Sequence, residues 1–320
     1  MLKQFVIRDS KIVETSGNDG SIYLYINPDE GERRYLVEGL GIDEHTLESS
    51  LDPYELARME VKPDQIALIV KRPKRYTAKD NFLFRIESIG MFIFNGGLAT
   101  GQPSRLIIVL GEDIPLFEGR LFARVDSIQD TILKLICQSI LHFEEHLKII
   151  NICSEELECE VSTSLTNRQL LSMFTLEKSL VYYLNAISSN GRVIDKLRSS
   201  AAKLALSPAH LELVDDLAIE NAQCYEMANI YSQVIASLMD ARASLINNNL
   251  NILMKNLNAI AIAVAVPSLI AGVGGMSEFS AMIGSDNLKM GYAAFAAVMV
   301  LLGVVTFFAV RASERFWRGL

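Results

Sequence analysis

Polar and small residues recur at seven-residue spacing near the C-terminal end of this 320-residue chain. They form two adjoining rows: Asn251, Asn258, Ala265 and Gly272, and Met254, Ala261, Ser268 and Gly275. Because residues seven apart share one face of an α-helix, the rows form a polar face on a helix otherwise covered by Leu, Ile and Val. Amide and hydroxyl oxygens on such a face could guide a hydrated cation through a wet pore. Small residues and asparagine also serve close helix packing, and the residues alone leave both interpretations open.

The helix that carries these rows is apolar enough to cross a bilayer. Two uncharged runs, at about 257–275 and 290–310, are separated by a short polar turn that contains Glu278, Asp286 and Lys289. At about 1.5 Å per residue, each run reaches roughly 28 to 31 Å, close to the thickness of the hydrocarbon core. The sequence therefore predicts a membrane hairpin, with lipid as one partner.

Basic residues flank this hairpin on the side away from its turn. Arg242 and Lys255 precede the first run and three arginines follow the second, whereas Lys289 is the only basic residue of the turn. The positive-inside rule places both termini in the cytoplasm and the turn outside. We expect a multi-pass protein of the cell (inner) membrane. The start of the chain is charged and lacks a long apolar run, so no cleavable signal is expected.

Composition argues against several other classes of protein. Half of the residues are hydrophobic and the mean hydropathy is +0.24, but the two apolar runs account for much of this excess. A net charge of −8 argues against nucleic acid as a partner, because binding phosphates calls for a basic face. The four cysteines are widely spaced without a Cys-x-x-Cys pair, which predicts buried thiols and neither disulfides nor a zinc site.

The first part of the chain, 1–124, has the pattern of an α/β domain. Strands are predicted at 21–26, 65–70, 89–94 and 106–110, and helical segments at 43–50 and 53–59. The glycine-rich segment 95–104 suits a hairpin connection better than a phosphate loop, because it lacks Gly-Lys-Ser/Thr and no helix follows.

From residue 125 onward the periodicity is helical. Residues 125–206 form a predicted helical layer, in which a stretch from about 167 to 186 ends at the segment 188–191. Ser207 and Pro208 supply a helix start, and no proline or glycine follows before Pro267. We therefore expect a stalk helix over 207–256 that continues into a membrane domain over 257–320 with a basic tail.

Histidines offer one alternative chemistry. His142-Phe-Glu-Glu-His146 matches the letters of a zinc-hydrolase motif, but it lies in an amphipathic helix without a supporting motif, and a solvated helix face is favoured. His45 and His210 lie near helix starts and are expected at the surface.

In its architecture and in several motifs the chain resembles the CorA-type divalent-cation channels, a two-span family with a Gly-Met-Asn motif. The resemblance covers the whole architecture, and the matching residues are Leu238-Met-Asp240, Asn248, Asn251, Met254-Lys255-x-Leu257 and Pro267, with segments 81–84 and 106–117. It implies a homo-pentamer whose first spans surround a pore. The implied lining is Asn251, Met254, Leu257, Asn258, Ala265, Ser268 and Gly272.

The resemblance also implies a selectivity mouth at Gly275, Met276 and Ser277, and a metal contact at Asp240 on the stalk. The residues alone favour equally that Asp240 pairs with Arg242 or with another stalk residue in the assembly. The family motif ends in asparagine, whereas this chain has serine, which is shorter and presents a single hydroxyl. Mg²⁺ sheds water reluctantly and suits recognition through its hydration shell, so selectivity for Mg²⁺ is the property most affected.

Three hypotheses of function follow. The first is a passive divalent-cation channel, for magnesium or for cobalt, nickel or zinc, in which the cation is substrate and also regulator and no organic cofactor takes part. The acidic clusters 155–158 and 215–216 either bind regulatory metal between subunits or are ordinary charged helix faces, and no single residue is assigned as a ligand. The second is a ligand-gated membrane effector on the same scaffold with relaxed ion selectivity. A membrane metalloenzyme using His142 and His146 ranks last, so the chain is not expected to be an enzyme.

Overall fold

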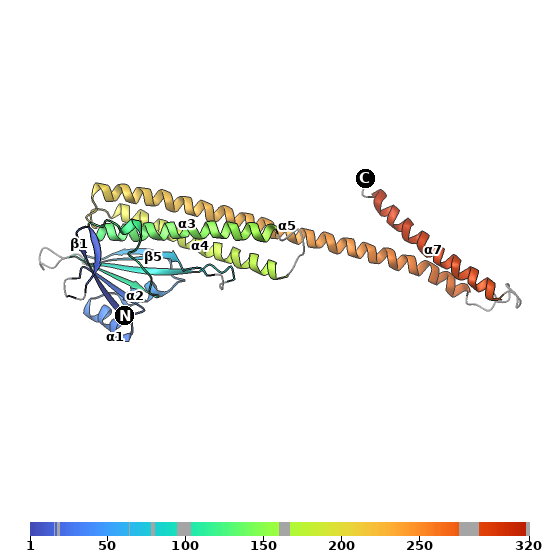
Figure 1. Ribbon diagram of the computed structural model, residues 1–320, viewed down its shortest axis with the longest axis horizontal. Coiled ribbons are helices and arrows are strands. Elements are labelled where there is room, and N and C mark those ends of the chain that lie inside the picture. The colour runs from blue at the N-terminus through green and yellow to red at the C-terminus, as the bar shows by residue number, and fades with distance from the viewer. Residues whose placement is uncertain are drawn as a thin grey trace. The chain divides into compact units, whose positions relative to one another are not determined.

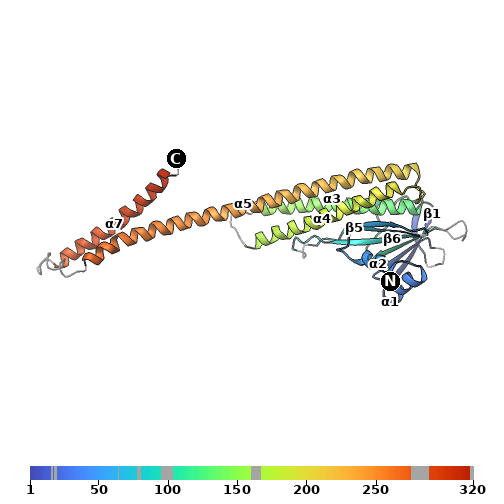
Figure 2. The same ribbon diagram turned by 180° about the vertical axis from the view of Figure 1, so that it is seen from behind.

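The computed structural model describes residues 1–15, 17, 20–63, 65–77, 81–94, 104–159, 167–274 and 288–317. The chain divides into two compact units, Met1–Met239 and Asp240–Leu320. The first unit contains a sheet with helices on both faces, and the second contains the end of one long helix and the helix that follows it (Figures 1 and 2).

Seven strands among the described residues form one sheet in the order β2-β1-β3-β7-β6-β5-β4. The strands are β1 Leu2–Arg8, β2 Lys11–Glu14, β3 Ile22–Ile26, β4 Arg58–Val61, β5 Gln65–Pro73, β6 Ile86–Phe94 and β7 Arg105–Leu110. β3 and β7 are parallel, and the other neighbouring pairs are antiparallel. The four predicted strands are confirmed, and β1, β2 and β4 are additional.

One predicted helix is wrong. The segment predicted as helix over 53–59 ends instead in strand β4, which pairs antiparallel with β5 and places Met59 opposite Leu68 in the core. Edge pairing and burial of Met59 outweigh the weak helical preference of this short segment. The glycine-rich connection at 95–103 lies outside the described residues, but its flanking strands β6 and β7 pair antiparallel with Phe94 opposite Arg105, as a hairpin requires.

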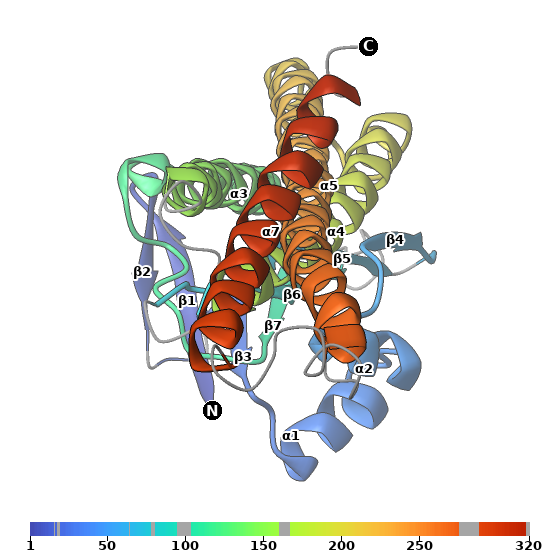
Figure 3. The ribbon, with the colours of Figure 1, turned by 90° about the vertical axis from the view of Figure 1, so that its right-hand side faces the viewer.

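Strand alternation directs apolar side chains to both faces of the sheet. On one face Leu24, Leu68 and Ile108 join a core with α3 (Ile128–Cys159) and α4 (Asn167–Ser199). On the other face Tyr25 and Ile107 pack with a π-helical turn at Tyr35–Gly39 and with α2 (Glu44–Leu51), and the short helix α1 (Glu30–Arg34) precedes that turn. Figure 3 shows α1 and α2 on the side of the sheet opposite α3 and α4. A 3₁₀ turn at Arg120–Phe122 precedes α3.

Helix α4 passes through the segment 188–191, where the sequence predicted a break. Asn190 is buried, and its side chain accepts a hydrogen bond from the Lys71 backbone N–H and donates one to the Lys71 carbonyl, both at 2.8 Å. The Ser189 hydroxyl donates to the Ala186 carbonyl within the helix. These contacts with the sheet and the helix backbone occupy the polar groups that favour a turn in isolation.

Helix α5 (Pro208–Gly274) is continuous, as the absence of glycine and of proline before Pro267 predicts. Ser207 caps its start, because the Ser207 hydroxyl accepts from the backbone N–H of His210 at 3.2 Å. The early part of α5 belongs to the core of the first unit, where the Asn221 amide donates to the Ile187 carbonyl of α4. Helix α7 (Leu288–Trp317) completes the second unit.

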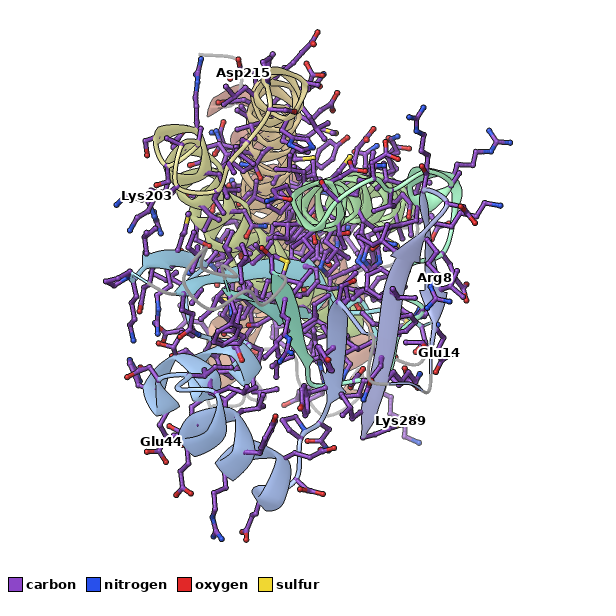
Figure 4. All side chains as sticks on the ribbon, turned by 90° about the vertical axis from the view of Figure 1, so that its left-hand side faces the viewer. Arg8, Glu14, Glu44, Lys203, Asp215 and Lys289 are labelled. Carbon is purple, nitrogen blue, oxygen red and sulfur yellow. The ribbon has the colours of Figure 1, made fainter. Side chains whose placement is uncertain are left out.

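Charged side chains lie on the outside of the first unit. Glu44, Lys203 and Asp215 point away from the sheet and helices in Figure 4, and so do Arg8 and Glu14. Lys71, in contrast, lies inside this unit, with 1% of its surface exposed. Its amine donates to the carbonyls of Asp52 and Pro53 just beyond α2 and to the Ser88 hydroxyl, so its charge caps the end of that helix. Burial lowers the pKa of Lys71 to about 8.

Helix α2 reaches the sheet closely because β6 carries glycine at the contact. A Cβ added at Gly90 would lie 2.5 Å from Cβ of the buried Ser50. We predict that Gly90→Ala lowers the free energy of unfolding by about 1–3 kcal/mol, because the core is overpacked. Gly111→Ala is the matched control, since a Cβ there meets nothing within 4 Å. Thermal unfolding of both variants in detergent checks this, and equal stabilities would contradict it.

Candidate functional site

The polar rows of α5 lie on an exposed face of the second unit. Met254 and Leu257 are 56% and 59% exposed, and Asn251, Asn258, Ala265, Ser268 and Gly272 are exposed as well. Because α5 is continuous, residues seven apart stand above one another at intervals of about 10.5 Å. The structure therefore brings together all seven residues predicted to line a pore. We call these seven residues the α5 column.

Asp240 belongs to the same face, further toward the N-terminal end of α5. It is exposed and precedes Met254 by fourteen residues, two seven-residue steps. Ser244 donates its hydroxyl hydrogen to the Asp240 carbonyl at 3.0 Å, one helical turn earlier. The Asp240 carboxylate thus lies exposed on the same face of α5 as the column.

The opposite face of α5 packs on α7. Ala259 is 3% exposed, and a Cβ added at Gly303 of α7 would lie 3.2 Å from the Ala263 carbonyl oxygen and 3.5 Å from Cγ of Pro267. Pro267 has no N–H to donate to the Ala263 carbonyl, four residues earlier. Gly303 therefore allows α7 to approach the helix where its hydrogen bonding is interrupted. Packing on this side leaves the column on the other side uncovered by the described residues.

The oxygen atoms of the column suit a cation. The Ser268 hydroxyl donates its hydrogen to the Val264 carbonyl at 2.7 Å, so its lone pairs remain as acceptors. Asn251 and Asn258 each add an amide oxygen. Neutral oxygens at wide intervals can contact a hydrated ion without stripping its water, which suits Mg²⁺. The predicted mouth at Gly275, Met276 and Ser277 lies outside the described residues.

Within the described part of the chain, two helices have the length and composition of membrane spans. These are the stretch Pro208–Gly272 of α5, in its apolar part, and Lys289–Ala312 of α7. Almost none of the residues in their most apolar windows are buried inside the chain, 6% and 0% respectively. Exposed apolar surface of this extent requires a lipid or protein environment.

The histidine pair is part of the core, so the expectation of a solvated helix face is wrong. His146 is 5% exposed, and its Nδ1 lies 2.7 Å from the hydroxyl of the buried Tyr183 on α4. Its ring centroid is 4.4 Å from that of the half-buried His142. Burial lowers the pKa of His142 to about 3, helped by His146 and Arg72, and burial with Arg72 lowers the pKa of His146 to about 4. Both rings are therefore neutral at physiological pH.

Other candidate groups are placed as follows. Cys137 and Cys153 are half-buried and Cys224 is buried, all as free thiols; burial raises the pKa of Cys224 to about 12. Asp215 pairs with Arg198 at 3.1 Å. Over the described part of the chain, no three His, Cys, Asp or Glu side chains gather to hold a metal ion. His45 is exposed, as expected, and His210 is half-buried.

The comparisons with known proteins agree with this architecture. The chain belongs to the CorA-like Mg²⁺ transporter protein family, whose model matches residues 18–311. The cobalt/magnesium transport protein CorA of Methanocaldococcus jannaschii is 26% identical over 328 residues, covering 96% of this chain and 97% of the relative. The family is one of membrane ion transport, and the two apolar helices fit it.

Solved structures share the fold. The complete structure of the CorA magnesium transporter from Methanocaldococcus jannaschii matches with a TM-score of 0.74 at 23% identity, covering 97% of this chain and 96% of that one. The full-length CmaX protein matches with a TM-score of 0.65 at 12% identity, covering 86% of this chain and 85% of that one. The α/β domain, the long helix and the C-terminal apolar helix are thus a shared arrangement.

The face of α5 that packs on α7, opposite the column, was not predicted from the sequence. Gly303 and Pro267 fix where α7 packs, and the half-buried positions Phe295, Met299 and Thr306 recur along α7 at helical spacing. The signal that could have revealed this face is the glycine in an otherwise apolar span.

The buried histidines predict a stability that depends on pH. From pH 6.5 down to about 4 the unfolded chain binds protons that the folded chain does not, so acidification lowers the free energy of unfolding. The loss is at most about 1.4 kcal/mol per pH unit for each histidine. We expect His142→Leu to flatten this dependence in thermal unfolding between about pH 7 and pH 4.5. Gln138→Leu, one turn earlier on α3, should keep the slope of the original chain, and an identical slope in His142→Leu would contradict the assignment.

Proposed function

We propose that this chain forms a passive channel for a divalent cation, with Mg²⁺ as the principal ion and Co²⁺ as the second. The observation that carries the proposal is the α5 column, whose oxygens lie exposed on the side of α5 opposite α7. Family membership and the name of the relative, a cobalt/magnesium transport protein, support the same ions. Nickel and zinc are further candidates to be compared in transport. The cation is cargo, and the mechanism requires neither an organic cofactor nor catalysis.

Transport on this scaffold requires several copies of the chain. Two spans cannot enclose an aqueous path, so subunits must contribute their α5 columns to a shared axis. We propose a homo-pentamer, with α5 of each subunit around the axis and α7 outside, next to lipid. The exposed column and the packed Gly303 contact support this arrangement of faces.

We assign a separate role to each domain of the chain. Residues 1–124 and 125–206 would sense intracellular cation, 207–256 would transmit the change along the stalk, and 257–320 would conduct. Arg242, Lys255 and Arg311 support cytoplasmic termini in the cell membrane. The membrane potential then favours entry of a divalent ion by about 4.6 kcal/mol per 100 mV, twice the value for a single charge.

Substitutions on the two faces of α5 test the column. Asn258→Leu should lower Mg²⁺ flux into proteoliposomes by about tenfold or more, because an apolar ring at this level can dewet the path. Asn251→Ala should also change flux. The matched controls Ile260→Leu and Ile252→Ala lie on the other side of the helix and should leave flux nearly unchanged. Equal effects on both faces would show that the seven-residue rows serve packing.

The mouth is tested by restoring the family residue. Ser277→Asn should increase selectivity for Mg²⁺ over K⁺ and raise sensitivity to cobalt hexammine, a rigid mimic of a hydrated cation, because asparagine adds a ring of carbonyl oxygens. Flux of magnesium, cobalt, nickel, zinc and potassium is measured side by side. Unchanged selectivity, together with strong gating by a cytoplasmic small molecule, would favour a ligand-gated effector with relaxed selectivity.

A further inference from the structure

A cleft of about 460 Å³ opens on the sheet face that α1 and the π-helical turn cover. Its floor is set by strand register. Gln4 of β1 lies beside Tyr23 of β3, Leu2 lies beside Tyr25, and Tyr23 lies beside Ile107 of β7. Because these residues occupy the same phase of the pleat, their side chains project to the same face. The volume falls in the range of roughly 300–1,000 Å³ typical of small-molecule sites.

Tyrosines dominate the walls of this cleft. Tyr25 is 3% exposed in the floor and Tyr23 is half-buried beside it, whereas Tyr35 on the π-helical turn is 55% exposed. Because Tyr35 and the two strand tyrosines line the same cleft, aromatic surface from two elements is available to a planar ligand. Burial, together with Tyr35 and Glu32, raises the pKa of Tyr25 to about 12, so its hydroxyl stays neutral and remains a hydrogen-bond donor.

The charge of the cleft comes from Arg105. This arginine begins β7, is half-buried at the cleft, and has no carboxylate partner among the residues that the structure describes. Glu32, the acidic residue of the lining, is already engaged, because it accepts from the Asp29 backbone N–H at 3.1 Å and from the Met1 amino group at 3.0 Å. The guanidinium of Arg105 is thus an uncompensated fork of donors beside aromatic surface.

We propose that this cleft binds a small planar organic anion, with one aromatic ring system and one carboxylate or phosphate group. The ring lies against Tyr35 and Tyr23, and the acidic group pairs with Arg105. Such a ligand matches the flat aromatic walls, the single cation and the volume at once. The site rests on residues of the first unit alone and is independent of the proposed ion pathway.

Calorimetric titration of the full-length protein in detergent tests the proposal. Indole-3-acetate and adenosine 5′-monophosphate are the probes, and indole-3-ethanol is the neutral counterpart of the first. We expect saturable binding of at least one anion. Indole-3-ethanol should bind at least about tenfold more weakly than indole-3-acetate, because one charged hydrogen-bonded pair is lost. Preference for one probe identifies the acidic group as carboxylate or phosphate, and either preference supports the site.

Variants locate the binding. Arg105→Gln should weaken the anion about tenfold or more while Arg105→Lys retains part of the affinity, because the charge stays but the fork is lost. Tyr35→Ala, at an exposed position, should weaken both the anion and the neutral compound. Arg85→Gln and Tyr54→Ala are matched controls, at an exposed arginine and an exposed tyrosine outside the cleft, and should bind as the original chain does.

Three results would overturn the proposal. They are no saturable binding of either anion up to about 10 mM, equal affinity for indole-3-acetate and indole-3-ethanol, and unchanged affinity in Arg105→Gln. Circular dichroism of each variant confirms its fold before titration. If Arg105→Gln does not fold, the pair Tyr35→Ala and Tyr54→Ala decides alone, because both positions are exposed: equal affinities in these two variants would also reject the site.

Discussion

The continuity of α5 as one helix, which persists through Pro267, is the constraint on which the candidate ion path depends. In a continuous α-helix each residue is rotated by about 100° from the previous one, so one fixed residue determines the direction of all others. The Gly303 contact fixes the side of Ala263 and Pro267 toward α7. Asn258 and Ser268 then necessarily lie on the other side. If the helix ended and restarted anywhere between Asn258 and Ser268, the polar face would no longer have a fixed direction relative to the packed face.

The first unit depends on a different constraint. Its sheet carries apolar side chains on both faces, so other elements must cover each face. Helices α3 and α4 are long and pack on one face, and the buried contacts of Asn190 with Lys71 align α4 with strand β5. Among the residues that the structure describes, the other face is covered by α1, α2 and a π-helical turn (Figure 3). These short elements leave the part near Tyr23 and Arg105 open. The cleft lined by Tyr23, Tyr35 and Arg105 thus lies where the short helices do not fully cover the sheet.

Much of the architecture could be predicted because its signals are strong and local. Apolar runs of bilayer length, a long stretch without glycine and alternating strands required no tertiary information. The failures are different in kind. Arg58–Val61 is a strand because β5 offers it a partner, and α4 continues past Ser188 because Asn190 finds partners on the sheet. Likewise His146 is buried because Tyr183 comes from another helix. The direction of the column followed from spacing, but its uncovered state depends on where α7 packs.

Pro267 has a consequence for how the membrane part is assembled. Without an N–H from Pro267, the Ala263 carbonyl lacks its usual partner, and an unsatisfied carbonyl in hydrocarbon costs several kcal/mol. The Cα–H groups of Gly303 can offset part of this cost only when α7 lies against α5. The first span alone is therefore less stable in the bilayer than its composition suggests. Biogenesis should favour release of the two helices from the insertion machinery as a pair.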